Sequence, residues 1–319
     1  MKRVATSLIG VLGLVLCAAP AYATTLDLTT AGSDGFINDA FYVAFNPNNV
    51  GTGTIDSYVR IQETGPESKT TPNGVGVEDG YNTDGTPQFD TKNGAFTHSI
   101  TLGQIPIVGV DTDGDGVIDA YYREFLLDLN EDQGHTDELL SLDELQIFLA
   151  DAGDGSQIPT TFTSGILDIN GDLIYRLDGG ADGPNSWALL NAHLTSGSGQ
   201  GYDLTTFVPF DLFLGYPDTA QLYLYAKFGV QGTDVNDTGV TLEGTTTVDG
   251  AVADGTFEEW AVRKKFTNPT CEELGTCTCE QLGTCNPPPP EIPEPSSLLL
   301  LGSGFASVIG FRARRKRNG

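Results

Sequence analysis

Short apolar segments alternate with polar, turn-rich segments along most of this chain. Between residues 24 and 268 the apolar segments are rich in β-branched and aromatic residues, and clusters such as NPNN, TDG and GSGQG separate them. Short strands punctuated in this way indicate an antiparallel β-sandwich, of jelly-roll or Ig-like type. The expected strands are residues 40–45, 54–62, 95–102, 120–129, 145–150, 172–178, 202–210 and 221–230.

Helix is expected to be a minor component of the domain. The segments TDELLSLDEL (136–145) and NSWALLNAHL (185–194) each permit one short helix. The segment FEEW (257–260) is expected to form an edge strand, with its aromatic side chains packed and its two glutamates in solvent. The predicted fold is therefore mainly β, with minor helix.

The N-terminal segment has the pattern of a secretory signal peptide. Lys2 and Arg3 precede an apolar run over residues 4–19, and Ala21-Tyr22-Ala23 supplies small residues before a cleavage point. Signal peptidase is therefore an expected partner, and the mature chain is expected to begin near Thr24.

The C-terminal segment combines prolines, an apolar run and a basic end. Residues 287–290 are all proline, and Pro293-Glu294-Pro295 follows. The uncharged run 296–311 would make a helix of about 24 Å, against a hydrocarbon core of about 30 Å, so it spans a bilayer only marginally. Two interpretations stay open, a permanent anchor and a temporary stop that a protease removes. The basic residues after the run are Arg312, Arg314, Arg315, Lys316 and Arg317.

This order of features resembles the PEP-CTERM sorting signal. The resemblance implies processing by an exosortase in a Gram-negative bacterium that makes exopolysaccharide. The chain would pass through an inner-membrane intermediate, held by its C-terminal helix, to the cell surface or extracellular matrix. The segments EFLLDLNED, LDELQIF, LYLYAKFG and GTFEEWAV also resemble the body of an uncharacterised group of PEP-CTERM proteins, which implies a single secreted domain but no particular activity.

The charge of the body excludes one class of partner. All 43 Asp and Glu lie between residues 24 and 295, together with nine of the 16 Lys and Arg, which gives this segment a charge of −34 against −27 for the whole chain. Nucleic acid is therefore not an expected partner, because its binding needs basic patches. Two explanations of this acidity stay open: it keeps the secreted protein soluble and does nothing more, or it favours association with divalent cations or a hydrated matrix.

The segment DTDGDGVID (111–119) is the strongest chemical motif of the body. Asp111, Asp113 and Asp115 occupy positions 1, 3 and 5 of an EF-hand-like calcium loop, Val117 would offer its carbonyl, and Asp119 could act directly or through water. The resulting prediction is a weak Ca²⁺ site.

The motif also departs from the calcium pattern. Position 12 is Tyr122 instead of a bidentate glutamate, and Glu124 lies two residues further on. No amphipathic helices flank the loop, so a bare Asp-Gly hairpin turn is the alternative. A second acidic stretch, Asp128, Asn130, Asp132 and Asp137, begins with similar spacing but loses it, and is expected to be a solvated loop.

Four cysteines form a tandem repeat, CEELGTCT followed by CEQLGTCN. In an oxidising compartment the simplest pairing joins Cys271 to Cys277 and Cys279 to Cys285. A four-thiolate zinc site is the alternative, although its spacing is not a standard one. The expected organisation is a signal peptide (1–23), a β-sandwich domain (24–268), a Cys/Pro-rich stalk (269–292) and a sorting signal (293–319).

No catalytic motif stands out. The three histidines, at 98, 135 and 193, are scattered, Ser198 lacks a G-x-S-x-G context, and with so many acids any carboxylate pair is expected by chance. The leading hypothesis is a non-enzymatic surface or matrix protein associated with exopolysaccharide or biofilm; a secreted hydrolase is one alternative. The other is a carbohydrate-binding module, whose platform would use Tyr81, Tyr121, Tyr202 or Trp187.

Overall fold

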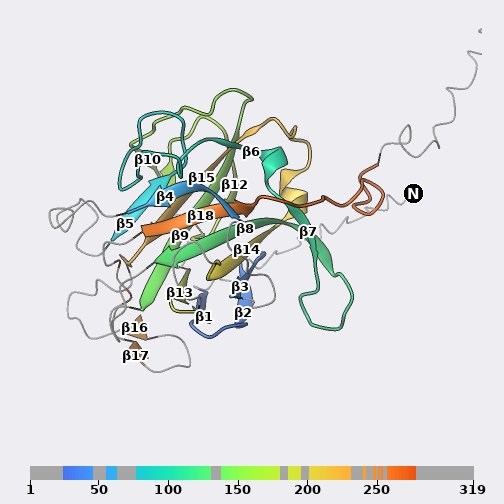
Figure 1. Cartoon of the computed structure of the whole chain (residues 1–319), viewed down its shortest axis with the longest axis horizontal. Helices are drawn as coiled ribbons and strands as arrows, with labels where there is room; N and C mark the ends of the chain where they lie inside the picture. Colours follow the sequence, from blue (N-terminus) through green and yellow to red (C-terminus); the bar gives the residue numbers. More distant parts are fainter. Residues whose placement is uncertain are drawn as a thin grey trace, which may run out of the picture. The chain divides into compact units, whose positions relative to one another are not determined.

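The computed structural model describes residues 24–45, 55–62, 77–130, 138–179, 186–194, 201–230, 240–241, 247–248, 251, 253 and 257–277. The chain divides into two compact units, Met1–Asn268 and Pro269–Gly319. The first unit holds two seven-stranded sheets, and its described residues are mainly β (Figure 1). The prediction of a mainly β domain is therefore confirmed, whereas the jelly-roll or Ig-like type stays a prediction.

The first sheet, which we call sheet A, is built around two long strands, β9 (Leu139–Ala150) and β15 (Gln221–Phe228). They pair antiparallel over almost their whole length. The strand order is β1-β13-β9-β15-β5, with β12 also paired to β9 and β6 to β15. The shorter strands are β1 (Thr25–Leu28), β5 (Glu78–Tyr81), β6 (Ile100–Thr101), β12 (Asp172–Arg176) and β13 (Trp187–Asn191).

The second sheet, sheet B, is antiparallel throughout and is centred on β8 (Ala120–Asn130). Its order is β2-β3-β14-β8-β18-β4, and β7 also pairs with β8. Sheet A is mixed, because β1 runs parallel to β13. The other strands of sheet B are β2 (Asp34–Ile37), β3 (Ala40–Ala44), β4 (Ile55–Ile61), β7 (Ile107–Val110), β14 (Leu204–Pro209) and β18 (Phe257–Arg263).

One hydrophobic core takes side chains from both sheets. Alternate residues of β8, such as Phe125 and Leu127, join alternate residues of β15, such as Leu222 and Leu224. This period of two is the pattern expected when one face of each strand is buried. Trp260 of β18 is fully buried in the same cluster. The faces of the two sheets that point away from this core are therefore the places where sites can be built.

The prediction of a short helix is wrong for both segments that the sequence suggested. The segment 136–145 enters β9, and the segment 185–194 contains β13. Each is rich in leucine and lies in the interior of sheet A, so cross-strand packing overrides the helix propensity of leucine. Helix among the described residues is limited to single turns, of which η3 (Leu102–Gln104) and η4 (Phe210–Phe213) are two.

Two further strand predictions need correction. Of the expected strand 95–102, only β6 forms, at its end. The FEEW segment is an interior strand instead of an edge, because β18 pairs with both β8 and β4. Its glutamates are not solvated either: Glu258 is 1% exposed and Glu259 is 5% exposed. Small two-stranded sheets also form between β10 (Phe162–Thr163) and β11 (Ile166–Leu167), and between β16 (Val240–Thr241) and β17 (Thr247–Val248).

In the second unit, a disulfide joins Cys271 to Cys277, the first pair suggested by the repeat. The pairing of Cys279 with Cys285 lies outside the described residues, as does the predicted helix at 296–311. Across the part of the chain that the structure describes, no helix combines the length and apolar character needed to cross a membrane.

Candidate functional site

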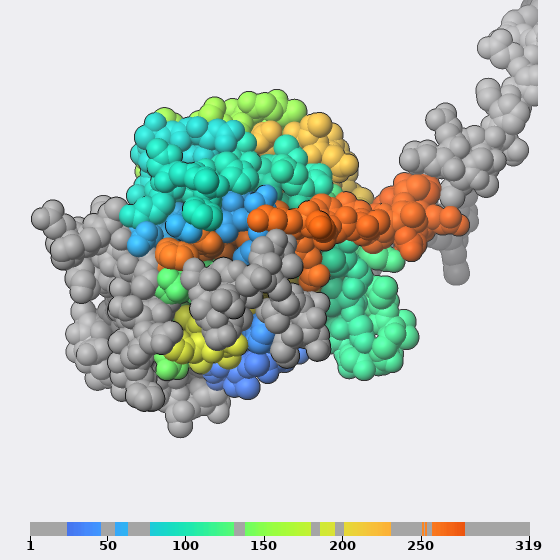
Figure 2. All heavy atoms as spheres, in the orientation of Figure 1, coloured from blue at the N-terminus to red at the C-terminus, as the bar shows by residue number. Residues whose placement is uncertain are grey.

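The acidic loop connects β7 to β8 as a hairpin. Val110 pairs with Ala120, and the backbone N–H of Asp119 donates to the Val110 carbonyl at 2.9 Å, so residues 111–119 form the connection. The loop extends from the end of these two strands and forms a knob on the surface (Figures 1 and 2). Its place in the fold is therefore the hairpin connection that the sequence allowed as an alternative to an EF-hand.

Asp111 organises the first half of the loop. One carboxylate oxygen, Oδ1, accepts the N–H groups of Gly114 (2.7 Å) and Asp115 (3.2 Å), while Oδ2 accepts that of Gly116 (2.7 Å). The hydrogen bond from Gly116, followed by those from Gly114 and Asp115, lowers the pKa of Asp111. Positive φ angles of 78° at Gly114 and 89° at Gly116 let the backbone turn toward this carboxylate.

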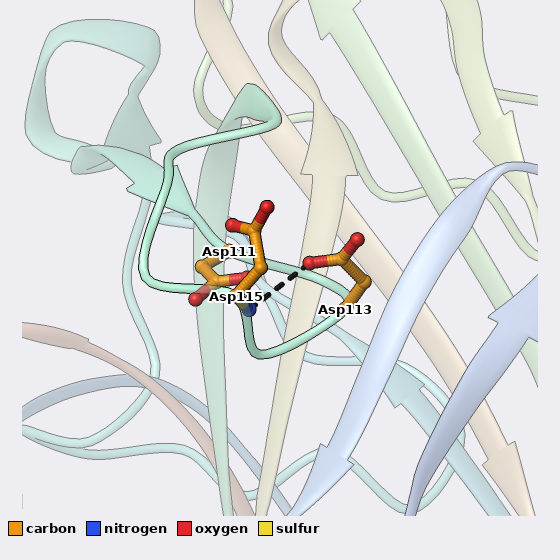
Figure 3. Close-up of side chains that lie close together, drawn as sticks. All are labelled: Asp111, Asp113 and Asp115. Carbon is orange, nitrogen blue, oxygen red and sulfur yellow. Dashed lines mark hydrogen bonds between the residues drawn. The ribbon is translucent and has the colours of Figure 1, made fainter.

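The other two carboxylates continue the same pattern. Asp113 accepts the N–H of Asp115 at 3.1 Å, and Asp115 accepts the N–H of Val117 at 2.8 Å. One oxygen from each of Asp111, Asp113 and Asp115 lies within 4.8 Å of the others (Figure 3). Each oxygen has two lone pairs, so a backbone hydrogen bond still leaves capacity to bind a cation.

Asp119 closes the loop from its far end. Its Oδ2 accepts both the hydroxyl (2.6 Å) and the backbone N–H (2.7 Å) of Thr112, and the hydroxyl bond is the main cause of its lowered pKa. The side chain of Val117 is 62% exposed. Ile118 is 54% exposed, and its side chain lies over Gly109 of β7, where a side chain larger than hydrogen would collide with it.

Neither candidate for the last calcium ligand is available. Tyr122 is 7% exposed on β8. Glu124 is 1% exposed and receives two hydrogen bonds from Arg263, at 2.6 and 2.8 Å. Burial raises the pKa of Glu124, and the Arg263 guanidinium opposes that shift. The loop therefore offers three clustered carboxylates, hard oxygen ligands of the kind that Ca²⁺ prefers, without a bidentate closing ligand.

The second acidic stretch is not a solvated loop throughout. Asp128 is 1% exposed within β8, and Asn130 ends that strand. Asp132 and Asp137 lie outside the described residues.

The aromatic platform proposed from the sequence is wrong. Tyr81, Trp187 and Tyr202 are 0%, 5% and 2% exposed, and of the four suggested residues only Tyr121 keeps part of its surface. Tyr81 instead belongs to a second, smaller cluster on the outer face of sheet A. The sequence could not reveal this burial. Alternating aromatic residues predict that a strand has one aromatic face, but they do not show whether that face meets solvent or is covered by a hairpin from elsewhere in the chain.

Three buried glutamates that could serve a hydrolase, Glu144, Glu258 and Glu259, are divided between sheet A and sheet B. Glu258 lies on the core-facing side of β18, while Glu259, on the opposite face, binds Arg60 and accepts the Ser57 hydroxyl at 2.9 Å. Glu144 forms an ion pair with Arg176 at 3.0 Å on sheet A. His98 bonds its own chain, with Nδ1 at 2.8 Å from the Ser99 carbonyl.

The C-terminal segment is recognised by comparison with known families. Residues 291–316 match the PEP-CTERM protein-sorting motif. The chain carries a PEP-CTERM sorting motif. The match includes Pro293-Glu294-Pro295 and most of the basic end, and it marks the protein as an exported substrate of exosortase sorting. No curated protein and no solved structure matches the chain.

Proposed function

We propose that this protein is a non-enzymatic component of the cell surface or extracellular matrix, held among exopolysaccharide after exosortase sorting. The observation that carries the proposal is the PEP-CTERM motif at residues 291–316, which supports export and sorting. A charge of −34 between residues 24 and 295 supports a hydrated environment, because such a charge keeps a protein soluble and separate from its neighbours.

The body would act as a β-sandwich whose exposed hairpin loop takes up calcium. Support comes from the three clustered carboxylates of the loop and from their hard oxygen ligands. Without a closing bidentate ligand, the affinity would fall in the extracellular range of about 10⁻⁴–10⁻³ M. At such an affinity calcium serves to stiffen the loop, and the site does not act as a sensor.

The segment between the domain and the motif would act as a stiff stalk. A disulfide closes its first repeat, between Cys271 and Cys277, and four consecutive prolines stand at residues 287–290. Proline-rich segments are extended and semi-rigid, so they keep a domain at a distance from its anchor. The second disulfide, between Cys279 and Cys285, is part of this proposal.

The sorting step is tested by replacing Pro293, Glu294 and Pro295 together with alanine in a Gram-negative host that has an exosortase. The wild-type chain should lose its C-terminal residues, by mass spectrometry, and move from the inner-membrane fraction to the surface fraction. The triple variant should keep its tail and stay in the membrane fraction. A control variant, Lys265→Gln, leaves the motif intact and should be processed as the wild type is. Equal processing of wild type and triple variant would contradict the proposal.

A further inference from the structure

A cavity of about 380 Å³ lies on the face of sheet A that points away from the shared core. On β15, Leu224 and Ala226 belong to that core, so Tyr225 and Lys227 point to the opposite face, and both line the cavity. The volume falls in the range of small-molecule sites, about 300–1,000 Å³. The cavity is on a different sheet from the acidic loop.

The floor of the cavity is a row of alternating charges across neighbouring strands. Asp79 of β5 pairs in register with Lys227 of β15, which pairs in turn with Glu144 of β9. Next to Glu144, Arg176 of β12 donates from Nη2 at 3.0 Å to its carboxylate. Burial raises the pKa of Glu144, while the hydrogen bond and charge of Arg176 oppose that shift. The strand register therefore fixes the order of donors and acceptors.

One wall of the cavity is the β10–β11 hairpin, which is tied firmly to the sheet. Its two turn residues, Ser164 and Gly165, have φ angles of 53° and 77°, as a type I′ turn requires. Gln146 of β9 is fully buried, and it donates to the Gly165 carbonyl at 2.7 Å and accepts the Leu167 N–H at 3.0 Å. This polar anchor places Phe162 at the cavity without relying on apolar contacts alone.

Aromatic rings form the apolar part of the wall. Phe162, which is 40% exposed, lies edge-on to Tyr225 with 5.4 Å between ring centroids, and 5.8 Å from Phe89. Phe89 is itself 37% exposed and has a φ of 57°, an unfavourable conformation for a bulky residue. Such strain persists only where the surroundings impose it, and it is concentrated at functional sites. Phe162 and Phe89 thus present an accessible apolar surface beside the charged floor.

Two polar groups of the cavity have unused hydrogen-bonding capacity. Among the residues that the structure describes, Lys227 forms no salt bridge and no side-chain hydrogen bond, although Asp79 and Glu144 flank it. Asp178 lines the cavity with a side chain that is 22% exposed; its Oδ2 lies 4.0 Å from Arg176 Nη2, too far for a hydrogen bond, and accepts none in that same described set. The cavity therefore offers a free donor and a free acceptor at once.

We propose that this cavity binds a sugar ring of a neutral polysaccharide. A sugar hydroxyl both donates and accepts hydrogen bonds, so one ligand can satisfy Lys227 and Asp178 together. The C–H face of the ring is apolar and can pack against Phe162, which is 40% exposed. The inference deepens the proposed function and rests on it, because it names the site through which the domain would hold exopolysaccharide.

Other ligand classes fit the cavity less well. Four carboxylates line it against two cationic side chains, so a polyanion would be repelled. A metal ion or a cationic ligand would meet the ammonium of Lys227 on the floor. A purely apolar ligand would leave the charged row without water or partners, which is costly. A neutral ligand that presents both donors and acceptors remains.

The proposal is tested by titrating the full chain, kept in mild detergent, with neutral di- and trisaccharides of glucose, galactose and mannose. Saturation-transfer NMR identifies a bound sugar, and calorimetry gives its affinity. Lys227→Met should weaken binding about 10-fold or more, since a hydrogen bond to a charged group contributes about 1.5–3 kcal/mol. Phe162→Ala should weaken it several-fold. The matched controls Lys265→Met and Phe266→Ala change an exposed lysine and an exposed phenylalanine outside the cavity, and should bind as the wild type does.

Each outcome decides for or against the site. Failure of all the sugars to bind, or binding that survives both Lys227→Met and Phe162→Ala in variants with wild-type melting curves, would overturn the proposal. Preference for acidic oligosaccharides would also overturn it. If neutral sugars bind as expected but the chain cleaves them, the sugar site stands and the non-enzymatic function fails. If sorting fails while binding persists, the error likewise lies in the proposed function.

Discussion

Glu258 places a carboxyl group in the hydrophobic core. Strand β18 places it between Ile61 and Leu129 in the backbone register, on the same face as the buried Trp260. Its side chain is 1% exposed, and neither carboxyl oxygen has a hydrogen-bond partner among the residues described. Burial raises its pKa well above the ordinary value. The folded state therefore holds a proton on Glu258 over a range of pH in which the unfolded chain releases it.

Replacing this residue with leucine should stabilise the protein. A buried polar group without a partner costs about 1–3 kcal/mol, so we expect Glu258→Leu to raise the free energy of unfolding by about that amount near pH 4, and by more at pH 7. The gain depends on pH. Above the unfolded pKa of about 4.3, the wild type loses up to about 1.4 kcal/mol per pH unit relative to the variant, until pH reaches the folded pKa. At and below pH 4 both states hold the proton, and the gain is smallest.

Urea unfolding at pH 4, 5.5 and 7 measures this difference directly. Glu259→Leu is the matched control, since it changes the next residue, on the opposite face, where the carboxylate binds Arg60 and the Ser57 hydroxyl. That control should destabilise the protein, because it leaves Arg60 without its partner. A Glu258→Leu variant no more stable than the wild type at pH 7, or a stability gap that does not grow with pH, would refute the reasoning.

Three further outcomes are expected. Calcium should bind the mature chain with a Kd of about 10⁻⁴–10⁻³ M and raise its melting temperature. Calorimetry should show that the Asp113→Ala/Asp115→Ala variant loses both effects. Calcium binding as strong as that of the wild type in this variant would exclude the loop as the site. Arg176→Met should lower the free energy of unfolding in urea by about 3 kcal/mol at pH 7, because Glu144 loses its counter-charge. The loss of stability should shrink at lower pH, where Glu144 is protonated. An equal loss at all pH values would contradict this explanation. Cys277→Ser opens only a short loop, so calorimetry should give an unchanged melting temperature for the β domain; a large decrease would show that the stalk stabilises it.

The local pattern of the sequence predicted most of the longer strands, but not their neighbours. The segments 40–45, 54–62, 120–129 and 221–230 correspond to β3, β4, β8 and β15, to within one or two residues at each end. These runs alternate strongly and end at turn-forming residues, so local propensity and burial agree. The leucine-rich strands β9 and β13 were harder, because leucine favours helix when its neighbours are unknown.

The candidate sites show the same limit. The acidic loop is contiguous, so its Asp-x-Asp-x-Asp spacing was sufficient to predict that three carboxylates would meet. The charged row of the cavity is not contiguous: Asp79, Glu144 and Lys227 come from three strands that are far apart in the chain. Their meeting depends on strand order, which a single sequence does not contain. The same reason hid the pairing of Glu124 with Arg263, which removed the last potential calcium ligand.

The pairing of β18 with β4 and β8 sets an order of events for the exported chain. β4 ends at Ile61, and its partner β18 begins at Phe257, close to the end of the domain. Sheet B therefore cannot be completed until almost the whole body has crossed the membrane, and a fold of such long-range contacts closes slowly. Until then, β4 and one side of β8 expose unpaired backbone, which invites aggregation. Once β18 has crossed, a C-terminal tether that holds the chain at the membrane would keep each molecule apart from its neighbours while sheet B closes.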